Sequence, residues 1–437
     1  MIISRLSYFI FLSILFLMFL KAFYFFCQCL VKFVSFFFFE KKTIIGEQYL
    51  DLERPCIVVS NHPNTLLDPF MIAERVSKQM HFLGNAGLFA HWFSNWFFRT
   101  FYCIPIKRKQ DNTTNVNNND SLEQCDIFLQ KGGCLYIAPE GSSWQERHLR
   151  EIKTGTARIA LSAEAKSNFQ LGLSIKPIGL TYTQLGVFGT RYLLEGMEAI
   201  RIIDYKNLYE KDSEAAVDAI TAEIANRLKK GMIDSEDHEQ DLLLERCEDL
   251  FLGEKKYEDE TAFRKSQQLS EKLKSLKQTK NNIYKNTLNT VNEYFTKLKN
   301  NNINELALIQ KNNYLLLLFG LPLFLLGFSQ NIIPFLVVYI LWKKVTPLGY
   351  DATVQYLGGI VIFSIFYTFQ KNILADFLPQ IPLYGFVYWA IASLSGKFAW
   401  SYFVHAKRFS QGLFCENKKM LLEERGKVLD FLISVGG

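Results

Sequence analysis

The sequence has few of the residues that mark metal enzymes and disulfide-stabilised proteins. Its 437 residues include only six histidines, and these form no H-E-x-x-H pattern, so a metal enzyme of that kind is not expected. The eight cysteines form no C-x-x-C pair, and several lie inside apolar runs. We therefore expect reduced thiols in a cytosolic environment, with no disulfide framework and no zinc site.

A strong charge of one sign is also missing. The 49 Lys and Arg residues exceed the 43 Asp and Glu residues by a formal net charge of +6. No cluster of basic residues with interleaved aromatics resembles a nucleic-acid surface, so we expect no nucleic acid as a partner. A modest positive charge suits contact with anionic lipid head groups or with phosphorylated substrates.

Long apolar segments are plentiful, and the first of them covers residues 1–40. It lacks a small-residue cleavage site, so a removable signal peptide is not expected. Either it is one membrane span, or it is a pair of helices in the membrane interface with Lys21 and Lys32 pointing outward. The two lysines cut the run into pieces shorter than about 20 residues, which favours the pair of interfacial helices.

Residues 41–205 have the texture of an α/β domain. Short apolar runs at 56–60, 134–141 and 174–182 predict buried strands, and helical patterns lie between them. This alternation predicts a mixed sheet flanked by helices.

The remainder of the chain is helical in two different ways. Residues 206–310 are charged and predict a helical region packed beside the α/β domain. Residues 311–437 contain apolar segments at 314–342, 353–369 and 381–405, which predict a C-terminal membrane domain of two to four helices and a tail. We expect a multi-pass membrane protein.

A histidine and an aspartate follow the strand predicted at 56–60. His62 would lie at the carboxyl edge of the sheet, and Asp68 would lie in the first turn of the next helix. The carboxylate would orient the imidazole, which would then act as a general base. Alternatively, His62 is satisfied by the backbone and Asp68 complements the helix dipole, and the motif alone favours this second interpretation.

Three further groups of residues are typical of a substrate site. Lys107 and Arg108 follow an apolar strand and suit a phosphate, although they also suit a solvated basic edge. Glu140 and Gly141 end another strand. There the carboxylate would bind substrate hydroxyls or support the site, and the glycine would let a ligand approach the backbone, unless the segment is a plain turn.

The third group lies at the start of a predicted helix. Lys153 and Gly155 are placed where a helix N-terminus favours an anion.

Taken together and in this order, these motifs resemble the PlsC superfamily of glycerolipid acyltransferases. The resemblance covers roughly residues 40 to 205 and includes the segment from Asn61 to Asp68, the I-P-I-x-R segment ending at Arg108, P-E-G at 139–141 and K-P-I-G at 176–179. The family motif of the first segment is N-H-x-x-x-x-D, whereas five residues separate His62 from Asp68 here. The segment 139–161 is similar to the branch that acylates glycerol 3-phosphate and dihydroxyacetone phosphate. Ser143 replaces an arginine that many members of the family carry.

The resemblance implies a membrane-bound enzyme with its catalytic domain on the cytoplasmic side. His62 and Asp68 would be catalytic, and substrate would contact Asn61 and the three groups above. A long-chain acyl group would pass from acyl-CoA or acyl carrier protein to the sn-1 hydroxyl of glycerol 3-phosphate in phospholipid synthesis, without a metal or other cofactor. The alternatives are a lysophosphatidate or other lysophospholipid acyltransferase, and a membrane scaffold or transporter with a degenerate acyltransferase domain.

Overall fold

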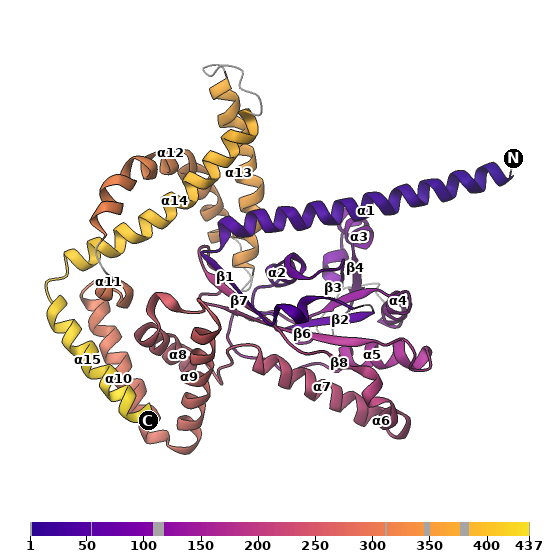
Figure 1. Ribbon diagram of the computed structural model, residues 1–437, viewed down its shortest axis with the longest axis horizontal. Coiled ribbons are helices and arrows are strands. Elements are labelled where there is room, and N and C mark those ends of the chain that lie inside the picture. Colours follow the sequence, from indigo (N-terminus) through magenta and orange to yellow (C-terminus); the bar gives the residue numbers. More distant parts are fainter. Residues whose placement is uncertain are drawn as a thin grey trace.

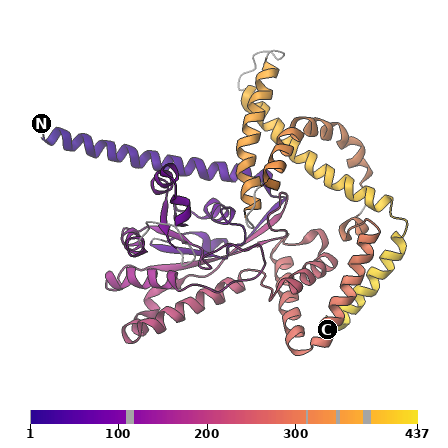
Figure 2. The same ribbon diagram turned by 180° about the vertical axis from the view of Figure 1, so that it is seen from behind.

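The computed structural model describes residues 2–53, 55–107, 118–310, 313–344, 350–375 and 384–436. An α/β domain and a helical region lie side by side, and a long N-terminal helix and a set of C-terminal helices run along and beyond them (Figure 1). The same arrangement seen from behind shows the N-terminal helix extending well past the sheet (Figure 2).

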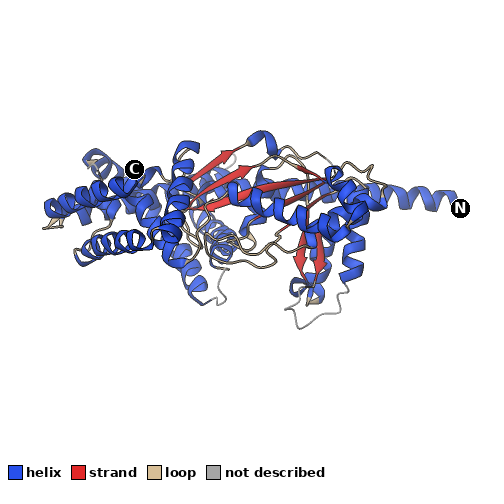
Figure 3. Cartoon of the chain, turned by 90° about the horizontal axis from the view of Figure 1, so that it is seen from below, coloured by secondary structure: helices blue, strands red, loops and turns tan. Residues whose placement is uncertain are grey.

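The α/β domain is built on one eight-stranded mixed sheet, drawn in red in Figure 3. Its path runs β1-β7-β6-β2-β5-β3-β4, and β8 pairs with β6. The strands are β1 (Lys41–Ile45), β2 (Cys56–Ser60), β3 (His81–Asn85), β4 (Cys103–Ile106), β5 (Cys134–Ile137), β6 (Ser174–Tyr182), β7 (Arg191–Gly196) and β8 (Ile200–Arg201). The pairs of β6 with β7 and with β8 are antiparallel, and the other pairs are parallel. The predicted mixed sheet with flanking helices is confirmed.

The two faces of the sheet pack into two different cores. In β2 every residue is buried, as expected for a central parallel strand covered on both sides. Ile57 and Val59 face the core that includes α5 (Gly155–Lys166) and α7 (Ser213–Lys230). Cys56 and Val58 face α2 (Leu67–Arg75) and the end of α1 (Ile2–Phe38). Because α7 belongs to the first of these cores, the domain extends past residue 205, where the sequence analysis ended it.

The remaining helices of the domain are α3 (Trp92–Thr100), α4 (Asn118–Gln130) and α6 (Lys206–Lys211). The aromatic side chains of α3 are turned outward, with Trp92 83% and Trp96 54% exposed. Phe23 of α1 and Phe101, just after α3, pack against each other with ring centroids 4.4 Å apart and planes tilted by 43°, so α3 continues the apolar surface of α1.

The burial of His81 in β3 should make the stability of this domain depend on pH. Its ring packs against Tyr102 and Phe128, and burial lowers the pKa of His81 to about 4 from 6.5. The folded state keeps His81 neutral, whereas the unfolded chain takes up a proton near its ordinary pKa of 6.5. The free energy of unfolding is therefore highest above pH 6.5 and falls as the pH drops towards 4. Between pH 7 and pH 5.5 we expect a loss of about 1 kcal/mol, measurable by thermal unfolding. In His81→Phe this pH dependence should be weaker, and an unchanged dependence would contradict the assignment.

The charged region forms a second helical core. It comprises α8 (His238–Phe251), α9 (Glu260–Thr279), α10 (Asn281–Asn300), α11 (Glu305–Ile309) and α15 (Lys418–Gly436). Within this region the chain divides at Lys280 into α9 and α10. The two helices pack on each other because both carry an apolar face, which includes Phe263, Tyr284 and Val291.

Three helices of the described residues are long and apolar enough to span a membrane. They are α1 over Phe11–Phe38, α12 (Tyr314–Lys344) and α13 over Asp351–Leu374. The third C-terminal segment forms α14 (Tyr384–Leu413), which packs on α12 and is not among these three. The favoured pair of N-terminal helices is wrong, since α1 is continuous and both Lys21 and Lys32 lie exposed on it. A lysine on a helix surface leaves the backbone hydrogen bonds intact and does not interrupt the helix.

Candidate active site

The proposed base and its carboxylate meet at the carboxyl end of β2. The His62 Nδ1 atom lies 3.1 Å from Asp68 Oδ2. Asp68 is fully buried in the first turn of α2, whereas the His62 side chain keeps 18% of its surface exposed. With Nδ1 turned to the carboxylate, Nε2 is the ring nitrogen left to exchange a proton with a ligand. This contact favours the oriented imidazole over a histidine satisfied by the backbone alone.

The Asp68 carboxylate is held by two more donors. The Asn64 backbone N–H donates to Oδ2 at 2.7 Å, and the Tyr182 hydroxyl donates to Oδ1 at 2.8 Å. Burial, and then the Asp68 charge, raise the pKa of Tyr182 well above its usual value, so its hydroxyl stays protonated. A carboxylate fixed in this way fixes the imidazole in turn.

Asn61 joins the segment that carries His62 to the neighbouring strand β6. Its side-chain amide donates to the Leu180 carbonyl at 2.8 Å and accepts from the Leu180 N–H at 2.7 Å. The side chain is buried, so the structure directs its amide towards the backbone of β6.

Glu140, which follows β5, supports the backbone of His62. One carboxylate oxygen accepts the His62 N–H at 2.8 Å, and the other accepts the Arg150 N–H at 3.1 Å. Burial raises the pKa of Glu140, and these two hydrogen bonds oppose the rise. Of the two tasks expected for this carboxylate, the contacts match that of supporting the site.

The structure describes the other predicted residues except Arg108. Since β2, β5, β3 and β4 are parallel, Lys107, which follows β4, lies at the edge that carries His62. Arg108 lies outside the described residues. The side chain of Lys153 lies beside Gly141, which has a φ of +73°, and its Nζ pairs with Glu151 at 2.6 Å. Gly155 is exposed at the first position of α5.

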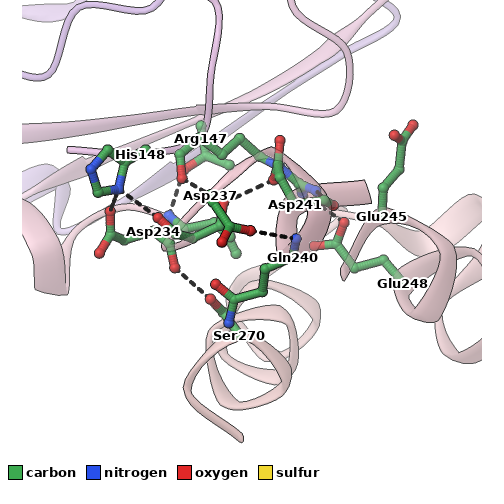
Figure 4. A network of polar contacts seen from close by, with 12 residues as sticks. Arg147, His148, Asp234, Asp237, Gln240, Asp241, Glu245, Glu248 and Ser270 are labelled. Atoms are coloured by element: carbon green, nitrogen blue, oxygen red, sulfur yellow. Dashed lines mark hydrogen bonds and ion pairs between the residues drawn. The ribbon is translucent and has the colours of Figure 1, made fainter. Parts of the chain in front are cut away.

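The loop after Gly141 is anchored by a residue that the sequence analysis missed. Arg147 is buried and donates to Asp241 Oδ1 at 2.7 Å, to Glu248 Oε2 at 2.8 Å and to the Tyr257 hydroxyl at 2.9 Å (Figure 4). Burial disfavours the charge of Glu248, but the Arg147 guanidinium lowers the pKa of this carboxyl below its usual range. The second helical core therefore holds the loop whose Trp144 backbone N–H donates to the His62 carbonyl.

This part of the chain is thus an α/β domain in which a carboxylate orients a histidine at the edge of the sheet. Residues 41–181 match the family model described as Acyltransferase. This match places an Acyltransferase domain at residues 41–181.

The names of known proteins similar to this chain give different acceptors. It is 26% identical over 210 residues to the 1-acyl-sn-glycerol-3-phosphate acyltransferase BAT2 of Brassica napus, covering 48% of this chain and 57% of the relative. It is 30% identical over 115 residues to glycerol-3-phosphate O-acyltransferase 2 of Saccharomyces cerevisiae, covering 26% and 15%. A crystal structure of the acyltransferase PlsC from Thermotoga maritima aligns with a TM-score of 0.35 and 18% identity, over 49% of this chain and 78% of that chain. The matched region thus spans no more than 57% of the length of either named relative.

Proposed function

We propose that this protein transfers a long-chain acyl group from acyl-CoA or acyl carrier protein to the sn-1 hydroxyl of glycerol 3-phosphate. The observation that carries the proposal is the 3.1 Å contact between His62 and buried Asp68 at the edge of the sheet. A hydroxyl is a poor nucleophile at neutral pH, so a base must take its proton as it attacks. No cofactor is required, because the thioester is already activated.

In the proposed reaction His62 acts twice on the same proton. Its Nε2 removes the proton from the acceptor hydroxyl as the oxygen attacks the thioester carbonyl, and Asp68 stabilises the imidazolium. The tetrahedral intermediate then breaks its C–S bond, and the leaving thiolate takes the proton back. The products are an oxygen ester and a free thiol, and no acyl-enzyme forms. Lys107, Arg108 and Lys153 are the groups that we propose for the acceptor phosphate.

A membrane is the proposed partner. The apolar helices α1, α12 and α13 and the outward aromatics of α3 support docking at a bilayer, where Trp side chains favour the interface. We further propose that the domain faces the cytoplasm, which is consistent with eight cysteines that are all free.

Lysophosphatidate is the second candidate acceptor, favoured by the name of the Brassica napus relative. The two acceptors differ in the apolar surface that they require. Purified full chain in detergent should be given labelled palmitoyl-CoA with either glycerol 3-phosphate or 1-acyl-glycerol 3-phosphate. Higher kcat/KM for glycerol 3-phosphate supports the proposal, and transfer to the lysophospholipid alone replaces it with the alternative.

Glu140 provides a test of how the site is supported. Glutamine keeps one acceptor oxygen but turns a donor towards the second backbone N–H, at a cost of about 1–3 kcal/mol. We expect Glu140→Gln to lower the rate of transfer by roughly 5- to 150-fold. The control is Glu210→Gln, whose exposed carboxylate pairs with Lys206 of α6 at 3.7 Å, away from the proposed site residues. Equal rates in the two variants would show that the Glu140 contacts do not support catalysis.

A further inference from the structure

The first turns of α13 are packed into the α/β domain, although the rest of this helix is apolar enough to span a membrane. Figure 1 shows the helix descending to the domain near β1 and α2. Ala352 and Tyr356 are buried in the core that includes Val58 and Met71. In the same turns, Asp351, Thr353 and Gln355 each contact a different loop of the domain.

Thr353 contacts the catalytic segment itself. Its hydroxyl oxygen lies 2.8 Å from the hydroxyl oxygen of Thr65, three residues after His62. Thr65 has a φ of +44°, which is unusual for a β-branched residue and must be held by its surroundings. The second hold is Ser143, whose hydroxyl accepts the Thr65 N–H at 2.9 Å.

Gln355 reaches the same segment through the loop between β6 and β7. Its amide donates to the Gly186 carbonyl at 2.7 Å and accepts from the Phe188 N–H at 3.1 Å. The Gly186 N–H then donates to the Asn64 side chain at 3.1 Å, and the Asn64 N–H donates to Asp68. Gly186 has a φ of +71°, which favours glycine, and a Cβ there would displace the Gln145 amide, 2.7 Å away.

Asp351 contacts the third loop and also the preceding helix. One carboxylate oxygen accepts from the Gln145 amide at 3.0 Å, and the other accepts from the Trp342 indole of α12 at 2.7 Å. Gln145 follows Trp144, and the backbone N–H of Trp144 donates to the His62 carbonyl at 3.3 Å.

We propose that the start of α13 is a positioning element for the His62–Asp68 pair, with Thr353 and Gln355 as its main positioning residues. One direct contact, from Thr353, and two chains of contacts, from Gln355 and Asp351, lead from this apolar helix to residues 62–65. The placement of that helix therefore sets the orientation of the imidazole. The rate of transfer should therefore depend on these contacts. This inference rests on the proposed acyl transfer.

The test compares matched variants of the full chain in phospholipid nanodiscs, with palmitoyl-CoA and glycerol 3-phosphate or lysophosphatidate. Thr353→Val removes one hydroxyl and keeps the shape, and we expect kcat to fall roughly 3- to 10-fold with an unchanged KM for palmitoyl-CoA. Thr353→Ser should restore most of the rate. Thr368→Val is the control, because this exposed hydroxyl of the same helix bonds only the Ser364 carbonyl among the described contacts.

Gln355→Met is an independent variant on the second loop and should also lower kcat without changing KM. It keeps the inference testable if Thr353→Val fails to fold. If both folded variants match Thr368→Val in kcat, the inference is overturned while the proposed function stands. If the unaltered chain transfers no acyl group to either acceptor, the proposed function itself fails.

Discussion

Replacing His62 with alanine is expected to lower the rate of acyl transfer by about 10²- to 10⁴-fold, the range that a positioned general base contributes. The KM for the acyl donor should change little, because the imidazole acts on the acceptor hydroxyl. The fold should persist, since the side chain is partly exposed and Asp68 keeps its contacts with Asn64 and Tyr182. Single-turnover transfer from labelled palmitoyl-CoA gives the rate.

His91→Ala is the matched control for this experiment. His91 is exposed before α3, and its side chain makes no capping hydrogen bond there. Both variants should be extracted from membranes like the unaltered chain. If His62→Ala retains the full rate, the imidazole is not the base, and a scaffold with a degenerate domain becomes the better account.

Replacing Arg147 with methionine is expected to cause the largest loss of stability. The change leaves the Glu248 carboxylate, which is 1% exposed, without its charged partner, and breaking a buried ion pair in this way costs about 3–5 kcal/mol. We expect the thermal unfolding midpoint of the full chain in detergent to fall by roughly 10 °C. The loop from Ser142 to Arg150 should lose its anchor on α8 (Figure 4).

The control for this prediction is Arg158→Met. Arg158 pairs with Glu214 at 2.6 Å, but the two side chains are 49% and 65% exposed, and such surface pairs contribute about 0–1 kcal/mol. A midpoint that falls equally in both variants would mean that the Arg147 network does not hold the two cores together.

The parts of the fold that the sequence predicted are those with local signals. The strands at 174–182 and 56–60 were predicted with their observed bounds, because each is a short, mostly apolar segment followed by turn residues. The charged helical region at 206–310 was predicted, but its division into α9 and α10 was not. Its cause lies in the apolar faces that pack on α8 and α15, and the helix break at Lys280 carries no glycine or proline.

The candidate site divides in the same way. The His62–Asp68 contact spans six residues and follows from a strand and the helix after it. The contact of Tyr182 with Asp68 spans 114 residues, and that of Thr353 with Thr65 spans 288. Tyr182 could have been inferred from its alternation with Leu180 along a predicted strand, but the sequence contains no local signal for Thr353.

The central claim is that an imidazole steered by a carboxylate activates an alcohol against a fatty thioester. The most direct test is the release of free thiol from palmitoyl-CoA by the purified full chain in detergent, with glycerol 3-phosphate tested first. The account predicts release that depends on an acceptor and equals the acyl ester formed. Release that is the same without any acceptor, or no release with either acceptor, would contradict it.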